Sequence, residues 1–194
     1  MTRYKLSEEL EPPHLQDVKA VLALDNDSVA SCSRDGSIAV WERNTSTRMD
    51  AHRFHLQSLL SGHQAYVNSL SLLPNTSTGR KFASASDAGL RTLKTAILAS
   101  GGNSTVILLH RLPASTPEPV HCLIGHSLNV CVLDYQQASQ KLISGSWDYT
   151  ARIWTEDKGA WSTSLILEGH KAAVWGVAFA PSSVERVGYL TGRL

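Results

Sequence analysis

Cysteine is scarce in this chain: Cys32, Cys122 and Cys131 are the three cysteines, and no Cys-x-x-Cys pair occurs. An odd number without metal-ligand spacing excludes a disulfide framework and a zinc knuckle, and it predicts a reducing compartment, the cytoplasm or the nucleus. An excess of charge of one sign is also missing, because 18 Lys and Arg residues face 17 Asp and Glu residues. A net charge of +1 provides no bulk attraction to nucleic acid or to an anionic membrane, so we expect neither as a partner.

Long hydrophobic runs are absent as well. No apolar segment approaches the roughly 20 residues that a membrane-spanning helix needs, and the charged N-terminal sequence shows no hydrophobic region of a secretory signal. A helical periodicity of useful length is equally missing. The 194 residues are nevertheless 42 % hydrophobic, which is the composition of a globular chain.

The dipeptide Gly-His recurs along the chain, each time between two strand-like segments. It occurs at Gly62-His63, Gly125-His126 and Gly169-His170, and a degenerate copy is Pro13-His14. The steps from one histidine to the next are 49, 63 and 44 residues, and a period in the forties suits one four-stranded propeller blade per repeat. The first and third copies continue into a tight turn and a tryptophan, Trp41 and Trp154. Short strands and polar turns at this period predict an all-β propeller.

Gly-His followed by Ser-x-Asp-x-x-x-x-x-Trp resembles the WD-repeat family. In that family a His, a Ser, an Asp and a Trp of one blade form a hydrogen-bonded tetrad. The resemblance implies this role for two sets of residues: His14, Ser33, Asp35 and Trp41, and His126, Ser146, Asp148 and Trp154. The residue types suit the role without the family, because an Asp in a turn accepts backbone N–H bonds and a buried Trp needs an acceptor for its N–H.

The second repeat departs from this pattern. Ser104 stands where the Asp is expected and His110 where the Trp is expected, so we expect its tetrad to be missing or weak. The repeat is also too long, and two registers compete within it. One candidate for the hairpin is Leu98 to Leu112, and the other begins at the similar segment Ser84-Ala85-Ser86-Asp87. We favour the first, which makes about 82–97 an insertion.

These repeats predict an incomplete propeller, with three blades and part of a fourth of an expected seven. We assign blade regions to 14–53, 63–118, 126–161 and, for the partial blade, 170–194. Residues 4–10 resemble the strand that fastens the last blade of a closed ring. We therefore expect a fragment, a truncated product or an imperfect gene model; partner chains that complete the ring are the alternative.

Catalytic and metal sites find little support in the sequence. Ser, His and Asp recur together, but they recur with Trp in two blades, which favours the structural tetrad over a nucleophile triad. Four of the eight histidines mark the repeats, and His52 and His55 have no Cys or acidic cluster at zinc spacing. Gly101-Gly102 lacks the Lys and Ser/Thr of a phosphate loop. We expect no enzyme, no cofactor and no metal.

The WD-repeat resemblance also implies a binding surface, which we call the top face. It is built from two residues at the start of each innermost strand and the residue before the turn Asp. In this chain these positions are Asp17, Lys19, Arg34, Tyr66, Asn68, Asn103, Asn129, Cys131, Trp147, Ala173 and Trp175. Arg34 and the aromatic members are the residue types that usually anchor protein interfaces.

A narrower resemblance rests on two segments, Ser144-Gly145-Ser146-Trp147-Asp148 and Ala172-Ala173-Val174-Trp175, in series with Asp17-Val18-Lys19. This series is similar to the N-terminal propeller of the phospholipase A(2)-activating protein family, the Doa-type ubiquitin-binding proteins of fungi. The resemblance implies a non-enzymatic, cytoplasmic and nuclear module that binds ubiquitin on its top face in proteasomal turnover. It further implies docking to an AAA-ATPase segregase, but only through domains that this chain lacks. The alternative is a generic WD-repeat scaffold for another protein or peptide.

Overall fold

The computed structural model describes residues 10–12, 14–44, 54–74, 96–179 and 187–191. Within these ranges the chain forms strands and turns and no helix. This agrees with the all-β expectation.

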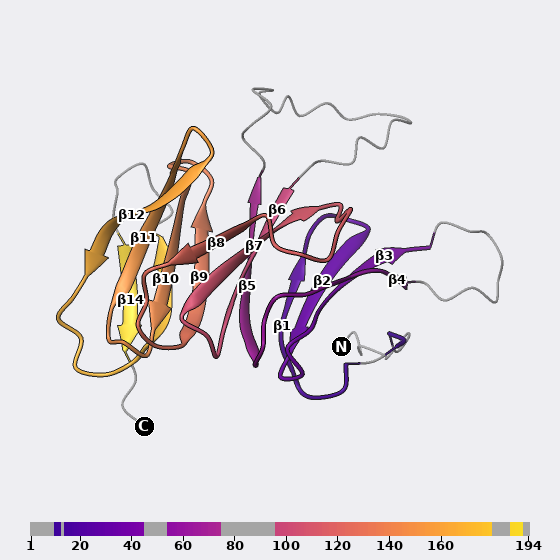
Figure 1. Cartoon of the computed structure of the whole chain (residues 1–194), viewed down its shortest axis with the longest axis horizontal. Helices are drawn as coiled ribbons and strands as arrows, with labels where there is room; N and C mark the ends of the chain where they lie inside the picture. Colours follow the sequence, from indigo (N-terminus) through magenta and orange to yellow (C-terminus); the bar gives the residue numbers. More distant parts are fainter. Residues whose placement is uncertain (1–9, 13, 45–53, 75–95, 180–186, 192–194) are drawn as a thin grey trace, which may run out of the picture.

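The strands form three antiparallel sheets of four strands and one of two. Blade 1 contains β1 (Val18–Ala23), β2 (Ser28–Ser33), β3 (Ile38–Arg43) and β4 (Phe54–Leu60), and blade 2 contains β5 (Val67–Pro74), β6 (Ala96–Gly102), β7 (Val106–Leu112) and β8 (His121–Ile124). Blade 3 contains β9 (Val130–Gln136), β10 (Lys141–Ser146), β11 (Ala151–Asp157) and β12 (Ala160–Leu167), and blade 4 contains β13 (Val174–Phe179) and β14 (Val187–Thr191). Each sheet is a meander in chain order, and the blades follow one another across the molecule (Figure 1).

The outer strands extend the blades past the ends assigned from the sequence. β4 and β8 pair with β3 and β7, so blades 1 and 2 continue beyond residues 53 and 118 to Leu60 and Ile124. In blade 2, β6 and β7 form the hairpin that we favoured, with Leu98 paired with His110. Ala96 and Ile97, the last residues of the expected insertion, belong to β6. The rest of that insertion, with Ser84–Asp87, and residues 4–9 lie outside the described residues.

The core lies between neighbouring blades. Blades 1 and 2 pack through buried residues that include Cys32, Ile38 and Leu60 on one side and Val67 and Leu98 on the other. Blades 2 and 3 pack in the same way through Ile107, Leu109, Leu123, Leu133, Leu142 and Trp154. Burial of each such side chain contributes about 1.5–3 kcal/mol, so the junctions between blades hold the innermost strands β1, β5, β9 and β13 side by side.

Two glycines of blade 2 let the innermost strand approach closely. A Cβ atom on Gly102 would stand 2.0 Å from the Tyr66 carbonyl oxygen, and one on Gly101 would stand 2.6 Å from the Val130 side chain. Both distances are shorter than real Cβ contacts. Gly102 therefore occupies a position where the backbone at Tyr66, just before β5, leaves no room for a side chain.

Candidate functional site

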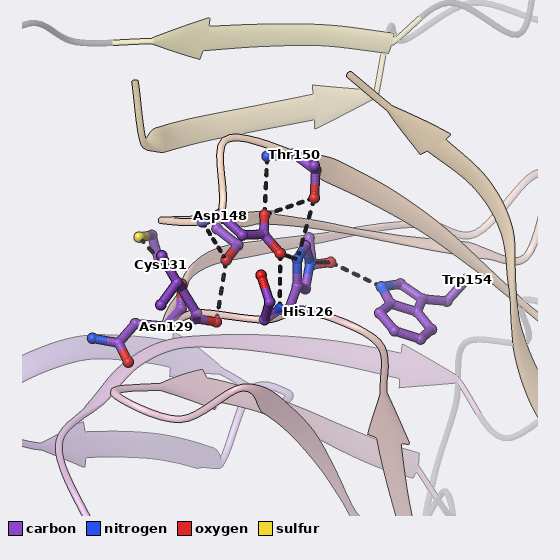
Figure 2. Close-up of polar contacts among 10 residues, drawn as sticks. His126, Asn129, Cys131, Asp148, Thr150 and Trp154 are labelled. Atoms are coloured by element: carbon purple, nitrogen blue, oxygen red, sulfur yellow. Dashed lines mark hydrogen bonds and ion pairs between the residues drawn. The ribbon is translucent and has the colours of Figure 1, made fainter. Parts of the chain in front are cut away.

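A continuous chain of hydrogen bonds joins the outer loop of blade 3 to its central strands (Figure 2). The Trp154 indole N–H donates to Ser144 Oγ at 2.8 Å, and Ser144 Oγ lies 2.7 Å from His126 Nε2. His126 Nδ1 lies 2.7 Å from Asp148 Oδ2. Asp148 also accepts bonds from the backbone N–H groups of Ser127 and Thr150 at 3.0 and 2.9 Å. The turn between β10 and β11 is thus tied to the segment that precedes β9.

The protonation states follow from this chain of donors. Burial lowers the pKa of His126 despite its contact with Asp148, so the ring is neutral and carries its proton on Nδ1, where the carboxylate accepts it. Burial raises the pKa of Asp148, but hydrogen bonds from Thr150, His126 and Ser127 outweigh it and lower the pKa to about 2. Ser144 then donates to His126 Nε2 and accepts from Trp154, which satisfies every member.

Blade 1 repeats this arrangement with one change. Trp41 Nε1 and His14 Nε2 contact Ser31 Oγ at 2.8 and 2.7 Å. His14 Nδ1 lies 2.8 Å from Ser37 Oγ, which donates to Asp35 Oδ1 at 2.5 Å, whereas the direct distance from His14 Nδ1 to Asp35 Oδ2 is 3.4 Å. Ser37 therefore bridges the His and the Asp that contact each other directly in blade 3.

The sequence analysis assigned the wrong serine to each tetrad. Ser31 and Ser144 bridge the His and the Trp, whereas Ser33 and Ser146 donate to the carbonyls of Gln16 and Leu128 at 3.0 and 3.2 Å. The pairing explains the correction, because Trp41 lies opposite Val29. Its ring is therefore near Ser31, two residues along β2, and not Ser33, which is four residues along.

The tetrad of blade 2 is reduced to one contact, as its sequence led us to expect. His63 Nε2 lies 2.8 Å from Ser100 Oγ, while His110 Nε2 donates to the Ser61 carbonyl at 2.8 Å. His110 is buried, and its Nδ1 has no partner within the part of the chain that the structure describes. Burial, followed by the proximity of His110, lowers the pKa of His63 to about 4, and burial lowers the pKa of His110 as well.

The top-face positions are held by the same backbone contact in three blades. The N–H groups of Arg34, Asn103 and Trp147, each just before its turn, donate to the carbonyls of Asp17, Tyr66 and Asn129 at 3.0, 2.7 and 3.0 Å. This contact brings the turn between the two central strands against the start of the innermost strand. The structure therefore places the members that the sequence assigned to one blade next to each other.

A β-bulge lies at the same position of every innermost strand. The unpaired residues are Lys19, Asn68, Cys131 and Trp175, because the register shifts fall between Val18 and Ala20 and at the equivalent residues of the other strands. A bulge leaves its extra residue out of the ladder and re-aims its side chain. All four bulged residues belong to the set that the sequence assigned to the top face.

The half of the top face formed by blades 1 and 2 is polar. Arg34 forms an ion pair with Asp17 at 3.2 Å, and its guanidinium lies over the Tyr66 ring, 5.5 Å from the centroid. Lys19 is exposed beside them. Asn68 donates to Asn103 Oδ1 at 3.2 Å and approaches the Val130 carbonyl at 3.5 Å, which links this half to blade 3. The side chains of Arg34 and Asp17 remain 45 % and 73 % exposed, and such an exposed ion pair contributes little to stability.

The half formed by blades 3 and 4 is apolar apart from Asn129, which is half-buried. Trp147 and Trp175 pack edge to face with ring centroids 5.8 Å apart, and 44 % and 46 % of their surfaces remain exposed. Cys131 lies buried beside them and donates to the Asn129 carbonyl at 3.9 Å. Burial raises the pKa of the Cys131 thiol to about 11, although a hydrogen bond from the Trp147 side chain opposes the rise. Ala173 is half-buried at the edge of this half.

Two exposed residues next to this apolar half were missed by the sequence reasoning. Leu128 is 49 % exposed, and Tyr149 is 51 % exposed in the turn that holds Trp147. The family pattern does not count their positions as face positions. A comparison of the two blades could have found them, because blade 3 has large apolar or aromatic residues where blade 1 has Gln16 and Gly36.

The described residues lack the features of a metal site and of a membrane-spanning helix. They hold no cluster of three or more His, Cys, Asp or Glu side chains that could bind a metal ion. No helix in the described ranges has the length and apolar character to cross a bilayer.

Comparison with known proteins agrees with this geometry. The family model for the WD domain, G-beta repeat, matches residues 10–42, 54–92 and 117–155, more than half of the chain. The crystal structure of the WD40 beta propeller domain of Doa1 superimposes with a TM-score of 0.64 and 31 % identity, over 88 % of this chain and 47 % of that chain.

Three curated proteins are similar at about the same level. Protein DOA1 of Saccharomyces cerevisiae is 33 % identical over 89 % of this chain, ubiquitin homeostasis protein lub1 of Schizosaccharomyces pombe is 32 % identical over 79 %, and phospholipase A-2-activating protein of Xenopus laevis is 32 % identical over 87 %. The chain spans 19 %, 18 % and 18 % of these relatives. The chain therefore belongs to the WD-repeat family, and it is similar to one part of Doa1, lub1 and the phospholipase A-2-activating protein.

Proposed function

We propose that this chain binds ubiquitin through its top face and serves ubiquitin homeostasis and proteasomal turnover as a non-enzymatic module. The observation that carries the proposal is the exposed Trp147–Trp175 pair, continued by Asn68 and Asn103 to the Arg34–Tyr66 pair. An apolar centre of aromatic residues with a polar surround is the usual composition of a protein-binding site. The similarity to ubiquitin homeostasis protein lub1 supports ubiquitin as the partner.

Binding fits the site better than catalysis does. Asp148, His126 and Ser144 are spaced like a nucleophile triad, at 2.7 Å for each step. However, Ser144 is completely buried and its oxygen already accepts the Trp154 N–H. A substrate cannot reach a nucleophile in this position, so these three groups support a structural role.

The experiment is a titration of isotope-labelled ubiquitin with the full chain, followed by chemical shifts, beside a spectrum of the chain itself. We expect saturable, localised shifts together with a dispersed spectrum of the chain. Trp147→Glu should weaken binding by about tenfold or more, because a buried aromatic anchor contributes on the order of 1–2 kcal/mol or more. Asp17→Lys tests the polar half in the same way.

The matched control is Ile124→Glu. Ile124 is 77 % exposed on the outer strand β8, which β6 and β7 separate from the innermost strand β5, and it is not one of the top-face positions, so its replacement should leave the affinity unchanged. Equal affinities of the wild type, Trp147→Glu and Asp17→Lys would refute the assignment of the top face. Absence of any shift with a dispersed spectrum of the chain would refute ubiquitin as the partner.

The second candidate is a WD-repeat scaffold for another protein or peptide, which the same aromatic pair would serve. Capture of one assembly without ubiquitin, lost on Trp147→Glu, would favour it. In either case we propose a cytoplasmic and nuclear location, since Cys32, Cys122 and Cys131 are all free thiols. We propose no docking to an AAA-ATPase segregase through the residues of this chain.

A further inference from the structure

Tyr149 adopts a backbone conformation that tyrosine rarely adopts. Its φ is +68°, in the left-handed region, where a side chain with a Cβ clashes with the following carbonyl. Gln140 and Lys158 are the other non-glycine residues with positive φ among the described residues, at +55° and +50°. Both of these are polar turn residues, so Tyr149 is the one bulky aromatic residue held in this strained conformation in the described chain.

The turn itself does not require a tyrosine. In blade 1 the equivalent residue is Gly36, with a φ of +84°, and it lies between Asp35 and Ser37 as Tyr149 lies between Asp148 and Thr150. The geometry of the turn requires positive φ, and glycine provides it without strain. Tyr149 therefore carries a cost that the fold of the blade does not explain.

Packing of the Tyr149 side chain does not offset this strain either. Half of the Tyr149 surface is exposed, at 51 %. In the part of the chain that the structure describes, its side chain makes no hydrogen bond, ion pair or ring contact, whereas Trp147 in the same turn packs on Trp175. Strained residues that the fold does not need are concentrated at functional sites.

The surroundings of Tyr149 share its chemistry. Leu128 is 49 % exposed, and its carbonyl accepts the Ser146 hydroxyl at the base of the same turn. Where blade 3 has Leu128, the buried Cys131, Trp147 and Tyr149, blade 1 has Gln16, Lys19, Arg34 and Gly36. Blade 3 is thus apolar at these four positions, and blade 1 is polar or has no side chain there. The neighbouring position is reversed, with Ser127 in blade 3 and the 90 % exposed Leu15 in blade 1.

We propose that Tyr149 is a partner-contacting residue that extends the apolar half of the top face outward from Trp147. The inference rests on the proposed function, and the occupant is the apolar part of the ubiquitin surface that the Trp pair engages. A tyrosine suits this place because it offers a large rigid ring with little conformational entropy to lose, and a hydroxyl for the wet edge of an interface.

The test separates stability from binding with three variants. Tyr149→Gly relieves the strain and removes the ring, so its midpoint of thermal unfolding should rise by about 2–4 °C while its affinity for ubiquitin falls by about fivefold or more. Gln140→Gly relieves the same kind of strain in the turn between β9 and β10, at the opposite end of the blade. It should raise the midpoint without changing affinity. Tyr149→Phe keeps both strain and ring, and should stay close to the wild type in both readouts.

Each outcome decides the matter. Weaker binding by Tyr149→Gly together with unchanged binding by Gln140→Gly supports the contact. Equal affinities of Tyr149→Gly, Gln140→Gly and the wild type overturn it, while the proposed function stands. No saturable binding of ubiquitin by the wild type refutes the proposed function, and the inference falls with it; the wild-type titration alone distinguishes this case.

Discussion

Ser144 lies at the centre of a buried chain of polar groups, and its hydroxyl serves two of them. It accepts from Trp154 and donates to His126, and without it both would be left unpaired in the interior. The His, the Asp and the Trp of this hydrogen-bonded network could be assigned from the sequence. The serine could not, because Ser144 and Ser146 face the same side of β10 and differ only in their distance from Trp154 across the sheet, which depends on the register.

We expect Ser144→Ala to lower the free energy of unfolding by about 2–4 kcal/mol, since it leaves a buried donor and a buried acceptor without partners. Ser100→Ala is the matched control in blade 2, where the hydroxyl serves His63 and no tryptophan. It should cost about half as much. Chemical denaturation of both variants measures the difference, and an equal loss would contradict the central role of Ser144.

The innermost strand and the turn beside it form one unit, which is repeated in blades 1 to 3. The spacing of Gly-His and Trp predicted this unit, and the face positions came with the family pattern, because both depend on local sequence. The bulges at Lys19 and Cys131 could not be predicted, since a bulge exists only relative to the partner strand. The same holds for the strain at Tyr149, which the letters Asp-Tyr-Thr do not reveal.

Gly102 gives a prediction at this scale. A Cβ there would stand 2.0 Å from the Tyr66 carbonyl oxygen, so Gly102→Ala must displace the backbone at the start of β5. We expect a loss of about 1–3 kcal/mol in unfolding free energy, typical of overpacking. Ser146→Ala, the equivalent position of blade 3, keeps its Cβ and loses only its hydrogen bonds. A thermal melt in which Gly102→Ala is no less stable than Ser146→Ala would contradict the close approach.

The whole molecule is a row of blades that pack against one another through their cores. The pH dependence of its free energy of unfolding sums contributions from several blades. His63, His110 and His126 stay neutral in the fold because burial lowers the pKa of each. In the unfolded chain they bind protons near pH 6.5. Their contribution to stability is therefore complete above pH 6.5 and is lost as the pH falls below it, in the case of His63 down to about pH 4.

We expect the free energy of unfolding to decline already between pH 6.5 and 4.5, before the carboxylates titrate. Asp35 and Asp148, whose pKa values lie at about 2, add a second loss between roughly pH 4 and 2. Denaturation curves at steps of one pH unit measure the first slope. His110→Gln should reduce it by up to about 1.4 kcal/mol per pH unit, and a flat profile above pH 5 would contradict the buried neutral histidines.

The arrangement of the blades was predictable because each Gly-His marks the junction between an outer strand and the next innermost strand. The length of blade 2 was harder to predict. The family model matches residues 54–92 as its second repeat, whereas the structure forms the central hairpin from Ala96 to Leu112. Both segments offer a Ser followed by polar turn residues, so the local pattern alone left two registers open, and the longer apolar run decided between them.

The bulges in the innermost strands have a consequence for how such a surface can change. Lys19, Asn68, Cys131 and Trp175 stand outside the ladder pairing of β1, β5, β9 and β13. Their identity is therefore only loosely coupled to the pairing of the sheet. A cation, an amide, a thiol and an indole already occupy the same backbone position in one molecule. The bulge position accepts different side chains, so the residues that a partner would contact can vary from blade to blade while the strand pairing stays the same.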